Sequence, residues 1–150
     1  MPIRKVGNLP YHHANRDIIC LPFHGELATF TWNYPMKEFL RVAPLAISDA
    51  YNYVRDGEGE LGDIFISAFN NEPKILWFYS HNYADKNYRL ETIDSALKKI
   101  REQSIPWKHS LAFPCLGYYK EDGIEQEDVI NLLNKHLGDA PMMIDLFVNY

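Results

Sequence analysis

Two of the six histidines, His24 and His81, each follow an apolar run with the composition of a buried strand. In α/β folds, ligand-binding and reactive groups collect where such strands end. Histidine exchanges protons near neutral pH, so each side chain is a candidate acid–base group. Each is equally open to interpretation as a histidine at a sheet edge with an ordinary hydrogen-bond partner.

The stretch SLAFPCLGYYKEDGIEQEDV, residues 110–129, has the pattern of a strand, a turn and a helix. The apolar run Leu111–Phe113 stops at Pro114, which cannot donate to a sheet ladder, and Gly117 permits a tight turn. Apolar residues then return at helical spacing at Val129, Ile130, Leu133 and Leu137. Such a junction presents backbone N–H groups to an anion. The alternative is an ordinary connecting loop.

Two other phosphate chemistries fit this stretch poorly. A cysteine phosphatase needs an arginine six residues after its thiolate, and the residue six positions after Cys115 is Glu121. A P-loop ends in Gly-Lys-Ser/Thr, which the segment 117–123 lacks. We therefore reject both.

The spacing of candidate ligand residues does not predict a metal site either. A calcium loop that began at Asp56 would need glycine and glutamate at its sixth and twelfth positions, which are Leu61 and Ser67. No two histidines have the i, i+4 spacing of a helical zinc site. We expect no metal site and no cofactor.

The length and composition predict one globular domain that spans residues 1–150. A net charge of −5 argues against nucleic-acid binding. No apolar run reaches membrane-spanning length, so we expect no membrane partner. Cys20 and Cys115 alone do not make a disulfide framework, which favours thiols in a reducing cytoplasm.

Apolar periodicity predicts alternating strands and helices. We expect strands at Ile3–Val6, Ile18–Phe23, Asp63–Phe69, Lys74–Ser80, Leu111–Phe113 and Met142–Val148. We expect helices at Met36–Ala43, at Pro44–Val54, at Arg89–Ser104 and before Gly138. The strands Asp63–Phe69 and Lys74–Ser80 should form a hairpin. Within the helix Arg89–Ser104, Asp94 precedes Lys98 by one turn, which is the spacing of a supporting ion pair. The fold class is therefore α/β, with a mixed, mostly parallel sheet of about six strands and helices on both faces.

This order of elements, together with several loops, resembles the macrodomain family, whose three-layer α/β/α fold binds ADP-ribose. The resemblance is nearest to a small phage-encoded macro-like family, which implies the host cytoplasm. In IRKVGNL, Asn8 replaces the family's aspartate that accepts from the adenine amino group, and Leu9 follows it. In DIICLPFH, His24 replaces the last asparagine of the strand that ends near the distal ribose.

Two further loops carry the resemblance. FPCLGYYKEDGIEQEDV is similar to the family's Pro-x-(Ile/Leu)-Gly loop, which assigns phosphate and distal ribose to Pro114, Cys115, Leu116, Gly117, Tyr118 and Tyr119. The family's glycine-rich Gly-Gly-Val-Ala loop corresponds here to GELATFTWNYPM, with one glycine, Gly25. Weaker diphosphate binding is therefore expected.

A branch of the family removes ADP-ribose from acidic side chains with a lysine and an aspartate. The lysine position falls here on His81 or Asn82, and the aspartate position near Asp122. Histidine serves acid–base chemistry but cannot form the imine that an amine forms. The resemblance thus implies a domain that binds ADP-ribose or a related nucleotide, without robust catalysis.

Two alternatives stay open. One is an ADP-ribosyl hydrolase, or a phosphate-ester hydrolase of ADP-ribose, that uses Asp122 and His81 on an ADP-ribosylated protein. The other is a degenerate macro fold that serves as a protein-interaction module. The sequence does not indicate the oligomeric state.

Overall fold

The computed structural model describes residues 3–6, 16–24, 39, 41–56, 62–81, 90–103, 110–114, 126–139 and 143–147. The strands are β1 (Ile3–Val6), β2 (Ile18–His24), β3 (Ile64–Ser67), β4 (Lys74–His81), β5 (Leu111–Pro114) and β6 (Ile144–Phe147). The helices are α2 (Pro44–Arg55), α3 (Leu90–Gln103) and α4 (Gln126–Leu137). No described helix is both long and apolar enough to cross a membrane.

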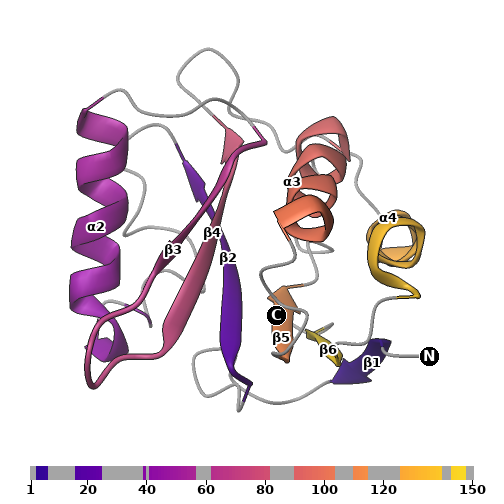
Figure 1. Ribbon diagram of the computed structural model, residues 1–150, viewed down its shortest axis with the longest axis horizontal. Helices are drawn as coiled ribbons and strands as arrows, with labels where there is room; N and C mark the ends of the chain where they lie inside the picture. Colours follow the sequence, from indigo (N-terminus) through magenta and orange to yellow (C-terminus); the bar gives the residue numbers. More distant parts are fainter. Residues whose placement is uncertain are drawn as a thin grey trace.

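All six strands form one sheet, in the order β1-β6-β5-β2-β4-β3 (Figure 1). Among the described strands every pairing is parallel except that of β3 with β4, which form the predicted hairpin. The prediction of a mixed, mostly parallel sheet is confirmed. Because the other five strands run in one direction, they start at one edge of the sheet, the amino edge, and finish at the opposite edge, the carboxyl edge.

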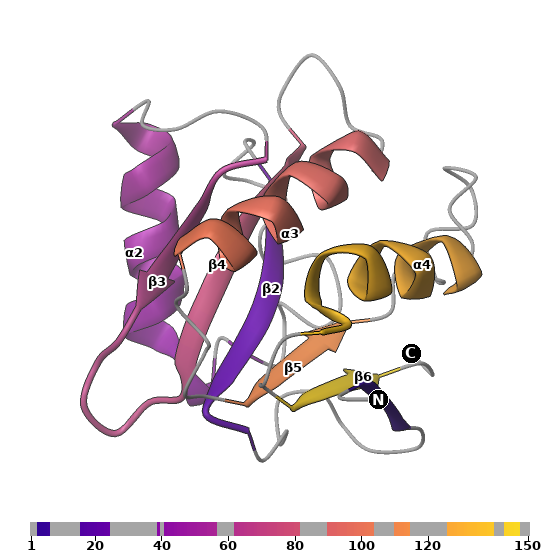
Figure 2. The ribbon, with the colours of Figure 1, turned by 45° about the vertical axis from the view of Figure 1, so that its right-hand side comes forward.

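Helices cover both faces of the sheet, as Figure 2 shows. The side chains of Ile18–Leu21 in β2 alternate between the two faces, as strand geometry requires. Ile18 and Cys20 pack into the core beneath α3 and α4, whereas Ile19 and Leu21 pack beneath α2. Burying each such aliphatic side chain stabilises the fold by about 1.5–3 kcal/mol. The three-layer α/β/α arrangement predicted from the sequence is confirmed.

Several predicted boundaries need correction by one or two residues. Both β2 and β4 extend by one residue, so that His24 and His81 are their last residues. The apolar run of β5 was predicted to stop before Pro114, but Pro114 belongs to the strand and pairs with Phe147. A proline is tolerated there because the final position of a strand loses at most one ladder hydrogen bond. Half of the helix predicted over 36–43 lies outside the described residues; of the described half, Phe39, Arg41 and Val42 are helical and Ala43 is not.

The predicted ion pair between Asp94 and Lys98 is wrong. Helices α3 and α4 pack side by side, and Asp94 Oδ1 lies 2.6 Å from His136 Nε2 and accepts a 3.2 Å bond from Lys135 Nζ. Lys98 instead faces Glu102, at 3.9 Å. The hydrogen bond to His136 is the main cause that holds the pKa of Asp94 below its usual value. Asp94 therefore pairs with two residues of α4, and not with a residue of its own helix.

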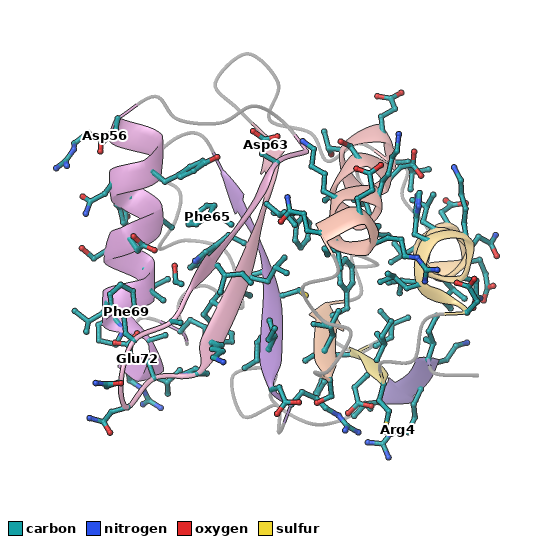
Figure 3. The ribbon with its side chains drawn as sticks, in the orientation of Figure 1. Arg4, Asp56, Asp63, Phe65, Phe69 and Glu72 are labelled. Carbon is teal, nitrogen blue, oxygen red and sulfur yellow. The ribbon has the colours of Figure 1, made fainter. Side chains whose placement is uncertain are left out.

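Clusters of hydrogen-bonded polar groups lie along the amino edge, and the sequence analysis did not predict them. The backbone N–H groups of Leu45 and Ala46 donate to the Glu72 carboxylate, at 2.9 and 3.1 Å. Glu72 thus caps the N-terminus of α2 from the turn between β3 and β4 (Figure 3). At the start of β2, Asp17 Oδ2 accepts from the Ser110 backbone N–H at 2.8 Å, and Ser110 Oγ accepts from the Asp17 N–H at 3.1 Å.

The third cluster at this edge is a carboxylate held by two arginines. Asp145 in β6 is 8% exposed and accepts two bonds from Arg4, each 3.1 Å, and two from Arg16, at 2.7 and 3.2 Å. Burial raises the pKa of Asp145, but the hydrogen bonds from Arg16 and Arg4 outweigh it, and the pKa lies below its usual value. The carboxylate is therefore charged, and each of its two oxygens accepts a hydrogen bond from both arginines.

Candidate functional site

The carboxyl edge brings together the ends of strands that are distant in sequence. Val6 pairs with Phe147, which in turn pairs with Pro114, so the last residues of β1, β6 and β5 lie in one row. Next to β5 comes β2, and next to β2 comes β4, whose last residues are His24 and His81. Ligand sites in parallel α/β sheets form at this edge.

His24 and His81 are direct partners in the pairing of β2 with β4. The register shifts between Phe23 and His24, which marks a β-bulge or similar irregularity at this point. Bulges are frequent next to active sites, where they end a pairing or change the direction of a residue. The sequence placed both histidines directly after predicted strands, but only the order of the strands shows that they are neighbours.

Pro114 ends β5, on the other side of β2 from β4. Three predicted site residues, His24, His81 and Pro114, therefore terminate three adjacent parallel strands. The other predicted site residues lie outside the described part of the chain: Asn8, Leu9, Cys115, Leu116, Gly117, Tyr118, Tyr119 and Asp122. In the sequence, Asn8 follows β1 by two positions and Cys115 follows β5 directly.

A buried apolar layer lies next to this edge. Phe78 of β4 and Phe113 of β5 stack with ring centroids 5.4 Å apart, and both belong to the core beneath α3 and α4. Cys20 of β2 is fully buried in the same core, and burial raises the pKa of its thiol. Cys20 is therefore protonated at neutral pH and serves packing, because a nucleophilic cysteine needs an accessible thiolate.

Two alternatives to the carboxyl edge are not supported by the described residues. The N-terminus of α2 is a natural anion site, but the Glu72 carboxylate already occupies its N–H groups. Within the described residues, no group of three or more His, Cys, Asp or Glu side chains is arranged to hold a metal ion. The carboxyl edge is therefore the candidate site.

Solved structures show which fold this is. The macrodomain of DarG from Thermus aquaticus matches with a TM-score of 0.79 and 16% identity, over 97% of each chain. The macrodomain of DarG from Mycobacterium tuberculosis matches with a TM-score of 0.76 and 19% identity, also over 97% of each chain. The chain has the macrodomain fold. This confirms the fold that the sequence resemblance implied.

A third solved structure, DarTG from Thermosipho africanus, is in complex with ADP-ribose. Its TM-score is 0.70 at 16% identity, and the match covers 89% of the present chain but 38% of the DarTG chain. No protein-family model and no curated protein sequence matches this chain. The likeness of this chain to its structural neighbours is therefore one of fold, with little identity in sequence.

Proposed function

We propose that this macrodomain binds ADP-ribose or a related nucleotide at the carboxyl edge of its sheet. The observation that carries the proposal is the convergence of β1, β2, β4 and β5 on one edge. It is supported by the likeness of the fold to part of DarTG from Thermosipho africanus, which was solved in complex with ADP-ribose. The loops that follow these strands carry the residues singled out by the sequence. Binding at that edge is also the general rule for parallel α/β sheets.

The proposed roles follow the positions of the residues along the edge. Asn8, two positions after β1, accepts a hydrogen bond from the adenine amino group, with Leu9 beside it; an amide oxygen retains this ability without the charge of an aspartate. The segment Pro114–Tyr119, at the end of β5, contacts phosphate and distal ribose through its backbone N–H groups. His24 lies at the end of the neighbouring β2, on the distal-ribose side.

Binding is expected to be weak, because the segment after β2 has a single glycine, Gly25, where close approach of backbone to diphosphate needs several. Each lost backbone contact to phosphate removes a charge-assisted hydrogen bond of about 1.5–3 kcal/mol. Losing one or two weakens affinity by about ten- to a thousandfold. Catalysis is expected to be slow or lacking.

Calorimetric titration with ADP-ribose, ADP and ATP tests the proposal. We expect ADP-ribose to bind with a dissociation constant above the micromolar range. His24→Ala should weaken binding, while Lys98→Ala, an exposed site on α3, should not. Submicromolar binding would contradict the role given to the missing glycines. No binding at millimolar ligand would contradict the proposal itself and favour a protein-interaction module.

A second candidate is hydrolysis of ADP-ribose from a modified protein, with Asp122 and His81 in acid–base roles. The observation that favours it is the position of His81 at the carboxyl edge, directly beside His24. A general base must come within hydrogen-bond reach of the proton it removes. Release of ADP-ribose from a modified protein is the assay that separates this activity from binding alone.

A further inference from the structure

The outer side of β3 is a feature of the sheet that the proposed nucleotide site leaves unexplained. β3 is the last strand of the sheet, and no described strand pairs with its outer side. A bare strand edge pairs readily with another strand, so proteins protect such edges with charges, prolines or bulges. The strand at the other end of the sheet, β1, has this protection, because Arg4 and Lys5 are exposed on it. Ile64–Ser67 contains no charge and no proline, and its register with β4 is regular.

Exposed apolar side chains gather at the same place. Within the described residues, the large apolar side chains that are exposed are Leu45, Ile66, Phe69 and Met143. Ile66 belongs to β3, and Phe69 follows the strand by two positions. Glu72 connects Leu45 to them, because its carboxylate accepts from the Leu45 N–H and its own N–H donates to the Phe69 carbonyl oxygen at 3.3 Å. A cluster of this kind on a surface is typical of an interaction site.

Contacts with α2 hold β3 in its extended form. Phe65, labelled in Figure 3, stacks on Tyr53 of α2 with ring centroids 4.1 Å apart. Ser67 Oγ donates to Asp49 Oδ2 of α2 at 2.5 Å. Ile66 lies on the opposite face of the strand and stays exposed. β3 is therefore ordered within the single chain.

We propose that a second copy of this chain pairs with this edge, β3 to β3, in an antiparallel arrangement about a twofold axis near Ile66. The two sheets then continue as one, in an isologous dimer. A strand of four residues offers few hydrogen bonds, too few to offset the entropy lost when a free peptide becomes ordered. A second copy brings a strand that is already ordered, and this favours it over an unstructured partner.

The twofold axis determines which residues face each other. An axis perpendicular to the sheet keeps each face of one sheet level with the same face of the other, so Ile66 lies opposite the partner's Ile66. Ile64 then lies opposite the partner's Ala68, and Phe65 lies opposite the partner's Ser67. None of these pairs brings like charges together, which would destabilise the pairing. The proposal does not depend on nucleotide binding.

The test is sedimentation equilibrium of the whole chain at concentrations up to about 1 mM, because small interfaces are weak. We expect an equilibrium between monomer and dimer. Ile66→Lys should weaken association by at least about tenfold, because the twofold axis places the two lysines opposite each other. Met143→Lys is the matched control, since it makes the same change at an exposed apolar side chain away from this edge, and should associate as the wild type does.

Wild-type protein gives a test that needs no variant. The outward-facing amides of residues 64–68 should exchange their hydrogens more slowly in concentrated than in dilute protein, whereas those of β1 should not change. The proposal is overturned if the wild type stays monomeric at about 1 mM, or if the exchange of these amides does not depend on concentration. It is also overturned if Ile66→Lys and Met143→Lys associate equally. Failure of ADP-ribose to bind leaves it intact, which separates it from the proposed function.

Discussion

The amino and carboxyl edges of the sheet contrast in how their polar groups are used. At the amino edge, the Glu72 carboxylate caps α2, Asp17 and Ser110 exchange hydrogen bonds, and Asp145 is held by two arginines. The carboxyl edge ends in two paired histidines and a proline, followed by the loops with candidate ligand residues. The polar groups of the first edge hold strand and helix starts together, and the second edge is where we propose that a nucleotide binds.

This difference follows from the direction of parallel strands. The connections that leave the carboxyl edge carry the residues that vary with function, whereas the amino edge needs polar groups that hold strand starts in register. Substitutions at the amino edge should therefore change the free energy of unfolding. Substitutions at the carboxyl edge should change binding first.

The largest effect on stability is expected from Asp145→Ala. Removing one partner of a buried ion pair typically costs about 3–5 kcal/mol, because the remaining charge is left without compensation. Arg16 would be that charge, since its side chain is 17% exposed, whereas Arg4 is 63% exposed. Urea unfolding measures the change. Arg4→Ala is the control and should lower the free energy of unfolding much less. Equal losses for the two variants would show that the burial of the ion pair does not set its contribution to stability.

Acid should destabilise the protein through the same group. The pKa of Asp145 is lower in the folded than in the unfolded protein, so its carboxylate stabilises the fold above the unfolded pKa near about 3.9. That stabilisation is lost as pH falls through the lower folded value. Asp94, whose pKa is also lowered, contributes in the same direction. Urea midpoints measured below and above about pH 4 should diverge less for Asp145→Asn than for the wild type.

A smaller effect is expected from Glu72→Ala, which exposes two N–H groups at the start of α2. Loss of an N-terminal cap costs about 0.5–2 kcal/mol. Glu91→Ala is the matched control, because Glu91 is exposed in the first turn of α3 and offers only the dipole interaction, a few tenths of a kcal/mol at an exposed site. Thermal unfolding compares the two. If Glu91→Ala lowers the free energy of unfolding as much as Glu72→Ala does, Glu72 has no special role as a cap.

The sequence predicted the layers and most elements, because apolar periodicity in β2, β4 and α3 reflects burial directly. It also predicted strands that end directly before His24, His81 and Pro114, one residue short of their ends in the structure. It did not predict that His24 and His81 are partners, because strand order is a property of the whole chain. Glu72 and Asp94 were missed for a similar reason, since their partners belong to other elements, far away in sequence.

The smallest effect, and the sharpest test of what the carboxyl edge does, is expected in catalysis. Release of ADP-ribose from modified glutamate or aspartate should be slow or undetectable, because the imine-forming lysine position holds His81 or Asn82. General acid–base help alone contributes about 10²–10⁴-fold, which leaves room for a slow reaction. The assay compares the wild type with Asp122→Ala and His81→Ala, with Lys98→Ala as the control on a distant surface. Slow release that is equal in all four proteins is the expected outcome. Robust turnover that either of the first two substitutions abolishes would make the carboxyl edge an active site and this protein a hydrolase.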